Sequence, residues 1–152
     1  MPKILEERQA FIESVIHDIK HISEEILWKS LNRKQFHDAI QHGITNLANS
    51  FNLKGLSEYR VDNFRADGRG DLIDVVWLAD LRPVSVFEID SSFRIKSIKK
   101  LLAVEVPFRF WVYYGTKDAT FLIQKYDPKN IIRVVQLENI RFKKRKKHSK
   151  IL

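Results

Sequence analysis

The 152-residue sequence contains no cysteine, which excludes disulfide bonds and thiolate metal sites. The N-terminal stretch MPKILEERQ has neither the basic start nor the unbroken apolar core of a signal peptide, so we expect a cytoplasmic protein. No apolar run approaches the roughly 20 residues that a membrane-spanning helix needs, so no membrane partner is expected. Glycine-rich phosphate loops and the histidine spacing of zinc sites are also absent.

The composition that remains is typical of one soluble globular domain. The sequence is 44% hydrophobic and 30% charged, and 152 residues are enough to bury a substantial core. It contains no internal repeat and no linker. We therefore expect a single domain over residues 1–140, in which residues 1–30 form an N-terminal helical extension.

The net charge of +8 is concentrated at the C-terminal end of the chain. Residues 141–152 carry +7 and no acidic residue, whereas the rest has 20 basic and 19 acidic residues. Such a block predicts a flexible basic tail that contacts a polyanion; a solvated tail without a partner is the alternative. Nucleic acid is favoured over a membrane surface, because the tail lacks a large apolar face. Two upstream lysines and five tail residues are the expected nucleic-acid contacts: Lys99, Lys100, Lys143, Lys144, Arg145, Lys146 and Lys147.

Two stretches early in the chain have helical periodicity. Over residues 4–28 an apolar residue recurs every three or four positions, which predicts an amphipathic helix, and a break near Ser23 is an alternative. A second helix is expected to begin at Ser30 or Asn32. Gly43 lies in its middle, where it costs stability, and we interpret it as a point of close packing.

The pattern then changes to short apolar runs. Strands are predicted in four places: 59–62, 72–78, 84–90 and 108–114. Turns are expected at 67–70 and around Arg82-Pro83. A helix is predicted from Ile95 to Leu102, whereas 120–124 and 130–137 can each be strand or helix. This order predicts an α/β fold with a mixed central β-sheet flanked by helices.

The residues that suggest chemistry lie between Asp71 and Lys100. Glu88 and Asp90 are two apart on a predicted strand, so their side chains point to the same face. Pairing of the two neighbouring strands as a hairpin would bring Asp74 towards them. Three close carboxylates repel one another unless a cation lies between them, and oxygen ligands favour Mg²⁺ or Mn²⁺.

In this order of elements, the sequences GDLIDVV (70–76) and FEID (87–90) resemble the acidic motif of the PD-(D/E)XK nuclease superfamily, which has a restriction-endonuclease-like core. The resemblance implies a Mg²⁺- or Mn²⁺-dependent nuclease that hydrolyses phosphodiester bonds of DNA. By the superfamily pattern, Asp74 and Glu88 match the metal-binding acids and the carbonyl of Ile89 matches the backbone ligand. Many such folds cut DNA as dimers, so a homodimer is an open alternative.

The sequence departs from the superfamily pattern at Asp90, where a lysine is usual. That lysine is thought to orient or activate the attacking water. The resemblance implies two substitutes: an acid at this position that binds metal or acts as a general base, or a lysine on the neighbouring helix. We expect Lys96 to be this lysine, and Lys99 and Lys100 are the next candidates. The expected catalytic residues are Asp74, Glu88, Asp90 and Lys96, and the expected metal ligands are Asp74, Glu88 and Ile89.

Each acidic residue also has a structural explanation. Asp74 can be an ordinary strand-entry residue, and Asp71 rivals it for the role of first acid. A buried Glu88 can be paired with a lysine that has no catalytic role. Asp90 can cap the helix that follows it.

Two further polar residues, His37 and Gln41, lie four apart on one helical surface, where they either support the site or are exposed. The alternative function is a catalytically inactive nuclease-like domain that binds nucleic acid or a protein partner. A structural RNA-associated protein held by its tail is a third hypothesis.

Overall fold

The computed structural model describes residues 2–27, 32–61, 70–138, 140 and 142. The helices are α1 (Pro2–Leu27), α2 (Arg33–Leu47), the 3₁₀ helix η1 (Ala48–Phe51), α3 (Ile95–Ala103) and α4 (Ala119–Gln124). The strands are β1 (Lys54–Val61), β2 (Asp71–Ala79), β3 (Arg82–Asp90), β4 (Phe108–Tyr113) and β5 (Ile132–Gln136). Together they form one α/β domain, which confirms the predicted fold class.

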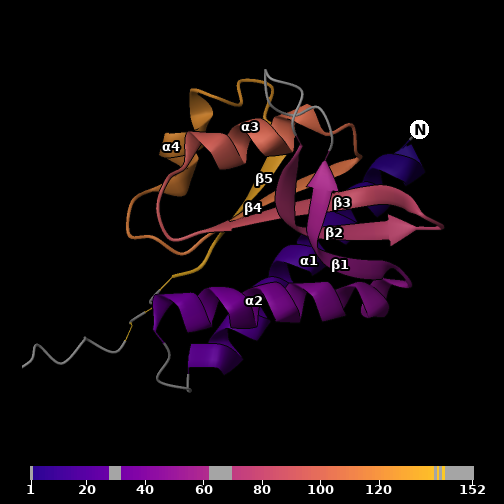
Figure 1. Ribbon diagram of the computed structural model, residues 1–152. Helices are drawn as coiled ribbons and strands as arrows, with labels where there is room; N and C mark the ends of the chain where they lie inside the picture. The colour runs from indigo at the N-terminus through magenta and orange to yellow at the C-terminus, as the bar shows by residue number, and fades with distance from the viewer. Residues whose placement is uncertain (1, 28–31, 62–69, 139, 141, 143–152) are drawn as a thin grey trace, which may run out of the picture.

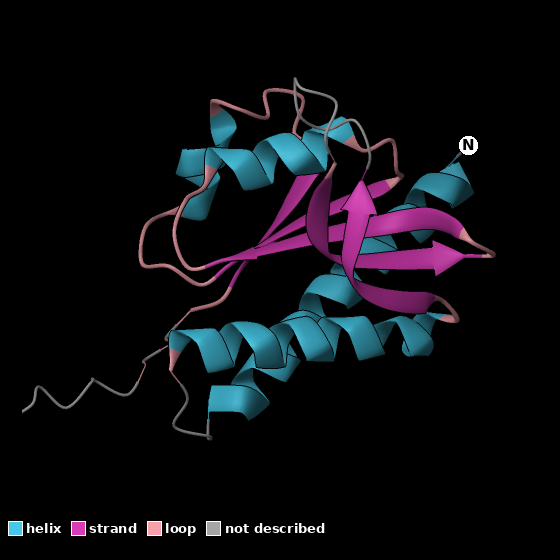
Figure 2. Cartoon of the chain, in the orientation of Figure 1, coloured by secondary structure: helices cyan, strands magenta, loops and turns pink. Residues whose placement is uncertain are grey.

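The five strands form one mixed sheet in the order β1-β2-β3-β4-β5. Neighbouring strands from β1 to β3 are antiparallel, whereas β3, β4 and β5 are parallel and are connected by α3 and α4. Helices α1 and α2 cover one face, and α3 and α4 cover the other (Figures 1 and 2). Among the described residues, no helix is long and apolar enough to cross a membrane.

The N-terminal helices follow the predicted pattern with one correction. Helix α1 is continuous over 26 residues, so the alternative of a break near Ser23 is wrong. The Ser23 hydroxyl donates a hydrogen bond to the Lys20 carbonyl at 2.7 Å, which satisfies it inside the helix. Helix α2 begins after Asn32, whose side chain forms a reciprocal capping box with Gln35.

Gly43 marks the close approach of α1 and α2, as predicted. A Cβ atom at this position would lie 2.7 Å from Cγ2 of Ile22, which is closer than carbon atoms pack. The absence of a side chain at Gly43 therefore lets the two helices pack together on one face of the sheet.

The central strand β3 is buried on both faces, so its alternate side chains belong to two different layers. Phe87 and Ile89 pack in the core beneath α1 and α2, and Val86 packs in the core beneath α3 and α4. Glu88 and Asp90 point the same way as Val86 by strand alternation, and both are buried. The fold thus places two carboxylates in the layer that α3 covers.

The segments 120–124 and 130–137, for which the sequence allowed either a strand or a helix, form one helix and one strand. Residues 119–124 form α4, whose first turn is capped by Asp118 through hydrogen bonds from the backbone N–H groups of Thr120 and Phe121. Residues 132–136 form β5, which pairs in parallel with β4. Strand β1 begins at Lys54, five residues earlier than predicted, and the turn expected at 67–70 lies mostly outside the described residues.

The turn between β2 and β3 is formed by Asp80 and Leu81, not by Arg82-Pro83 as predicted. Ala79 pairs with Arg82, and the two turn residues have φ angles of 46° and 69°. Positive φ at both positions is the geometry of a type I′ hairpin. Pro83 is instead accommodated in β3, opposite an irregularity at Trp77 and Leu78.

Replacing Leu81 with glycine is expected to raise the free energy of unfolding by about 0.5–1 kcal/mol. The side chain is 83% exposed, so its removal loses little packing, while glycine adopts the left-handed conformation without strain. Urea denaturation measures the change. Leu81→Ala is the control, because alanine keeps the strained φ angle and should give no gain. Equal stabilities of the two variants would contradict the assignment of strain to this position.

Candidate active site

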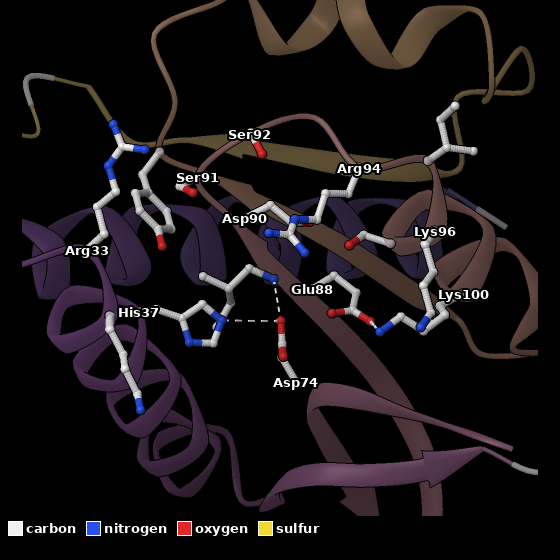
Figure 3. A pocket seen from close by; sticks show the side chains of 15 residues that line it. Arg33, His37, Asp74, Glu88, Asp90, Ser91, Ser92, Arg94, Lys96 and Lys100 are labelled. Atoms are coloured by element: carbon white, nitrogen blue, oxygen red, sulfur yellow. Dashed lines mark hydrogen bonds and ion pairs between the residues drawn. The ribbon is translucent and has the colours of Figure 1, made fainter.

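A pocket of about 780 Å³ opens between the start of α2, the carboxyl end of β3 and helix α3 (Figure 3). Buried carboxylates lie at its base, where Glu88 and Asp90 are 2% and 8% exposed. Basic side chains from α2, from α3 and from the loop before α3 line the rest of the pocket: Arg33, Lys34, Arg94, Lys96 and Lys100. The pocket therefore combines an acidic base with a basic rim.

Asp74 lies in β2 just beyond the point where its pairing with β3 ends, since the register between the two strands begins at Val75 and Phe87. Its Oδ2 atom accepts a hydrogen bond from the backbone N–H of Ile89 at 2.8 Å. This contact places the carboxylate at the fork between the two strands, where it lines the pocket.

Helix α2 supports Asp74 through two side chains. Gln41 donates a hydrogen bond to the Asp74 backbone carbonyl at 2.9 Å, and His37 Nε2 lies 3.7 Å from Oδ2. The hydrogen bond to Asp74 raises the pKa of His37, although burial works against it. Burial by itself would raise the pKa of Asp74, but hydrogen bonds from His37, Glu88 and Ile89 hold it below its usual value. The two polar residues on α2 thus support the site instead of being merely exposed.

The carboxyl group of Glu88 lies across the fork from that of Asp74, close enough for charge and hydrogen bonding between them to shift the pKa of each. Burial, followed by the charge of Asp74 and this hydrogen bonding, raises the pKa of Glu88 to about 10, and nearby Lys100 only partly offsets this. Two carboxylates in contact need a proton or a cation between them to offset their repulsion. Either a proton on Glu88 or a bound cation can relieve this repulsion.

Lys100 is the lysine that the structure brings to Glu88. Its Nζ atom lies 2.5 Å from Glu88 Oε1 and donates a hydrogen bond to the Leu72 carbonyl at 2.8 Å. Lys96 Nζ instead pairs with Asp71 Oδ2 at 2.9 Å, and this bond is the main cause that lowers the pKa of Asp71 to about 2. The Lys96 side chain is 57% exposed, compared with 13% for Lys100.

The geometry of the helix crossing explains this difference. Helix α3 connects two parallel strands and so runs back along β3 towards its start. One helical turn covers 5.4 Å, close to the roughly 6.6 Å that two strand residues span. Lys96 therefore lies near the end of β3, whereas Lys100, one turn later, reaches Glu88.

Asp90 is held by the core and not by a cap. Its Oδ2 accepts a hydrogen bond from Trp111 Nε1 at 2.9 Å, and Arg94 Nε lies 3.9 Å from its Oδ1. Burial raises the pKa of Asp90, against hydrogen bonds from Ser97 and Trp111. Helix α3 starts at Ile95 with no side-chain cap, so Asp90 does not cap it.

The expected cluster of three carboxylates is reduced to a contacting pair. Within the part of the chain that the structure describes, no group of three His, Cys, Asp or Glu side chains could hold a metal ion. Asp74 and Glu88 contact each other, whereas both carboxylate oxygens of Asp90 face Trp111 or Arg94. A metal at this site would need a ligand from the backbone or from water in addition to the two acids.

With such an additional ligand, the oxygen atoms of Asp74 and Glu88 fit a small hard cation. Mg²⁺ is usually bound by one or two carboxylates together with several waters. A cation bound between Asp74 and Glu88 would relieve the repulsion that raises the pKa of Glu88. The carbonyl of Ile89, a residue that lines the pocket, stays a predicted third ligand.

The other predicted nucleic-acid contacts lie away from this arrangement or outside the described residues. Lys99 is exposed on α3 and does not line the pocket. The tail residues Lys143, Lys144, Arg145, Lys146 and Lys147 are not among the described residues, so their predicted role is neither supported nor opposed.

Replacing Glu88 with glutamine is expected to stabilise the protein by about 1 kcal/mol at pH 8. Below pH 4.5 the Glu88 carboxyl is protonated in both the folded and the unfolded protein. Above it the unfolded chain ionises while the folded chain retains its proton, so the free energy of unfolding falls as the pH rises towards 10. Urea denaturation of both proteins at pH 5 and pH 8 measures this. A stability difference that did not grow with pH would contradict the raised pKa.

Comparison with known proteins gives a structural similarity alone. No protein-family model matches the sequence, and no curated protein matches it either. The crystal structure of the protein of unknown function AF1548 is similar to this chain, with 14% sequence identity and a TM-score of 0.40. The similarity covers 62% of this chain and 54% of AF1548, about half of that protein's length. It assigns no family to the chain.

Proposed function

We propose that this protein is a metal-dependent nuclease that hydrolyses phosphodiester bonds of DNA. The observation that carries the proposal is the contact between the carboxyl groups of Asp74 and Glu88 at the base of a pocket with a basic rim. Burying two acids in contact opposes stability, and such arrangements cluster at functional sites. A basic rim attracts a polyanionic substrate, and the acidic pair provides oxygen ligands for the cation that phosphodiester chemistry uses.

The order of elements supports the same proposal. Helix α2, strands β1 to β3, helix α3 and strand β4 follow one another as the resemblance to the PD-(D/E)XK superfamily implies. Asp74 and Glu88 lie on neighbouring strands of this unit. We therefore propose a restriction-endonuclease-like core in which these two residues are the metal-binding acids.

Asp74 and Glu88 would hold Mg²⁺ or Mn²⁺, with the Ile89 carbonyl as the backbone ligand. When bound, the ion would supply the Lewis acid that activates water and neutralises charge on the phosphate. Glu88 must lose its proton to act as a ligand, and the adjacent Lys100 ammonium favours the ionised form. Lys100 would also donate hydrogen bonds to a phosphate oxygen in the pocket. We thus transfer the proposed lysine role from Lys96 to Lys100.

Asp90 has a different role in this proposal. Its hydrogen bond to Trp111 holds the carboxylate in the core, so we propose that it positions β3 and the loop that follows it. Arg94 pairs with Asp90 and lines the pocket, where its guanidinium can contact substrate phosphate.

The alternative is an inactive nuclease-like domain that binds nucleic acid. Two observations favour it: Asp90 stands where a lysine is usual, and Lys100 already pairs with Glu88 and Leu72. A lysine so engaged would have to change partner before it could contact substrate.

Incubation with supercoiled plasmid and with a fluorescein-labelled 20-bp duplex tests the proposal. Nicking or linearisation is expected with Mg²⁺ or Mn²⁺ and none with EDTA. Binding without cleavage in either metal would favour the inactive domain. If deletion of residues 143–152 removed all binding while changes to the acidic pair had no effect, a tail-driven role would replace both.

A further inference from the structure

A second cavity, of about 440 Å³, lies between helix α1 and the amino ends of strands β4 and β5. Among the described residues that line it none is acidic, and four are basic: Arg8, Arg109, Lys129 and Arg133. The candidate active site, by contrast, combines its basic rim with buried carboxylates. The second cavity therefore presents positive charge without a carboxylate in its wall.

The two cavities lie at opposite ends of the parallel strands. Asp90, at the end of β3, pairs with Tyr113 and lines the candidate active site. Phe108, at the start of β4, lines the second cavity. Phe108 and Tyr113 are five positions apart on one strand, which corresponds to about 17 Å. A single phosphate group therefore cannot contact both cavities.

Arg8 is held against the wall of the second cavity by two contacts. Its Nη2 atom donates a hydrogen bond to the Pro107 carbonyl at 3.2 Å, and its guanidinium carbon lies 5.1 Å from the ring centroid of Phe108. Pro107 and Phe108 both line the cavity. A guanidinium has five N–H donors, so these contacts orient Arg8 and leave further donors for a ligand.

Arg109 is held by backbone carbonyls at the end of α3. Its Nε donates a hydrogen bond to Leu101 at 2.7 Å, and its Nη2 donates one to Val104 at 2.5 Å. Burial lowers the pKa of Arg109 and the charges of Asp127 and Glu105 act against this, but neither of these acids lines the cavity. An arginine remains protonated at neutral pH even when it is partly buried, so Arg109 contributes a fixed charge.

The other two cations come from the segment that leads into β5. Asp127 orders this segment, because its carboxylate accepts hydrogen bonds from the backbone N–H groups of Ile131 and Ile132 at 3.1 and 2.8 Å. Ile132 packs in the core beneath α3 and α4, so by strand alternation Arg133 points to the side of α1. Lys129 is exposed at the cavity mouth. The fold thus brings basic side chains from three distant segments to one cavity.

We propose that this second cavity is a phosphate-binding site, whose ligand is a phosphate group of a nucleic-acid backbone or of a small phosphorylated molecule. Guanidinium groups match the geometry of phosphate oxygens and form strong charge-assisted hydrogen bonds with them. Donors that are already oriented lose less conformational entropy on binding. The inference is independent of the nuclease proposal, since the site contains none of its acids.

Pyrophosphate is the first probe, added in EDTA to ¹⁵N-labelled protein and followed by NMR. The backbone amide signals of residues 108–109 and 129–133 are expected to shift along one saturable curve. Arg8→Gln and Arg133→Gln should each raise the Kd from this curve by about tenfold or more, because each removes charge-assisted hydrogen bonds. Arg82→Gln, at an exposed position in the β2–β3 hairpin, is the matched control and should leave the Kd unchanged.

The same titration with the 20-bp duplex identifies the source of the phosphate. Shifts of the same amide signals by the duplex, weakened in Arg8→Gln, would indicate a nucleic-acid backbone. Shifts with pyrophosphate and none with the duplex would indicate a small phosphorylated ligand. Melting temperatures of the variants show whether each one folds, and the titration of the parent protein does not depend on them.

Absence of these shifts at pyrophosphate concentrations up to about 10 mM overturns the proposal, since a site with a Kd of about 1 mM would then be nearly filled. Shifts confined to residues around Asp74 and Glu88 overturn it as well, as does an equal Kd in all three variants. Cleavage assays separate this inference from the nuclease proposal. Cleavage without the shifts rejects the phosphate site alone, and the shifts without cleavage reject the nuclease alone.

Discussion

Asp74→Asn and Glu88→Gln are each expected to lower the rate of metal-dependent DNA cleavage by about 10³-fold, with the fold retained. Each change removes a carboxylate that, in the proposed function, would bind the metal, and removing one preorganised electrostatic interaction from an active site typically costs two to three powers of ten. The measurement is single-turnover cleavage of the labelled duplex at saturating Mg²⁺ and Mn²⁺.

The matched controls replace carboxylates elsewhere with the same amides. Asp80→Asn lies in the exposed β2–β3 turn, and Glu105→Gln lies in the exposed segment after α3, so both should cleave at the parent rate. Circular dichroism and thermal melting establish that Asp74→Asn and Glu88→Gln fold. Parent-like cleavage by either folded variant would reject the acidic pair as the active site.

The second large effect is expected at Lys100. Lys100→Met should lower the cleavage rate by about 10²-fold or more, because its partly buried ammonium is the one in contact with Glu88. Lys96→Met should change the rate less than threefold, since Lys96 is exposed and paired with Asp71. Both residues are on α3 and four positions apart, so each variant is the other's control.

Lys100→Met is expected to fold, because burial beside Asp74 raises the pKa of Glu88 and so favours its neutral form when the lysine is absent. The rate of Lys100→Met is therefore interpretable once its melting temperature has been measured. A larger loss in Lys96→Met than in Lys100→Met would return the catalytic role to Lys96, as the sequence predicted. Equal and small losses in both would favour the inactive-domain alternative.

Much of the fold is encoded in local patterns that need no tertiary information. The capping box of Asn32 and Gln35 begins α2 at one of the two predicted positions, because both partners lie within one helical turn. The alternation of Phe87, Glu88 and Ile89 defines β3 and places the carboxylate in a different layer from its neighbours. The mixed sheet follows from the order of such elements.

Local patterns were ambiguous where an element is short or a residue has two uses. Ser23 can cap a helix or bond back to a carbonyl within one, and only the packing of α1 on the sheet decides between them. The six residues of α4 are too few to show a helical period. The same limit applied to β5, whose assignment depends on pairing with β4.

In the candidate site, too, local sequence specifies some features and the tertiary structure specifies others. Asp74, Glu88 and Asp90 could be selected from the spacing of acids on two adjacent strands, because strand geometry sets the direction of each side chain. The choice between Lys96 and Lys100 depends on how far α3 runs back across β3, which neither segment encodes alone.

The acidic pair at the base of the pocket is thus a consequence of local sequence, while its partners are a consequence of packing. Phe142 meets Phe36 and Tyr114 only because the sheet brings the end of the chain back to α2. Contacts between segments so distant in sequence depend on the whole fold, since chain closure over such lengths is set by the packed core and not by neighbouring residues. The tertiary structure therefore decides which lysine faces Glu88 and which aromatic rings Phe142 packs against.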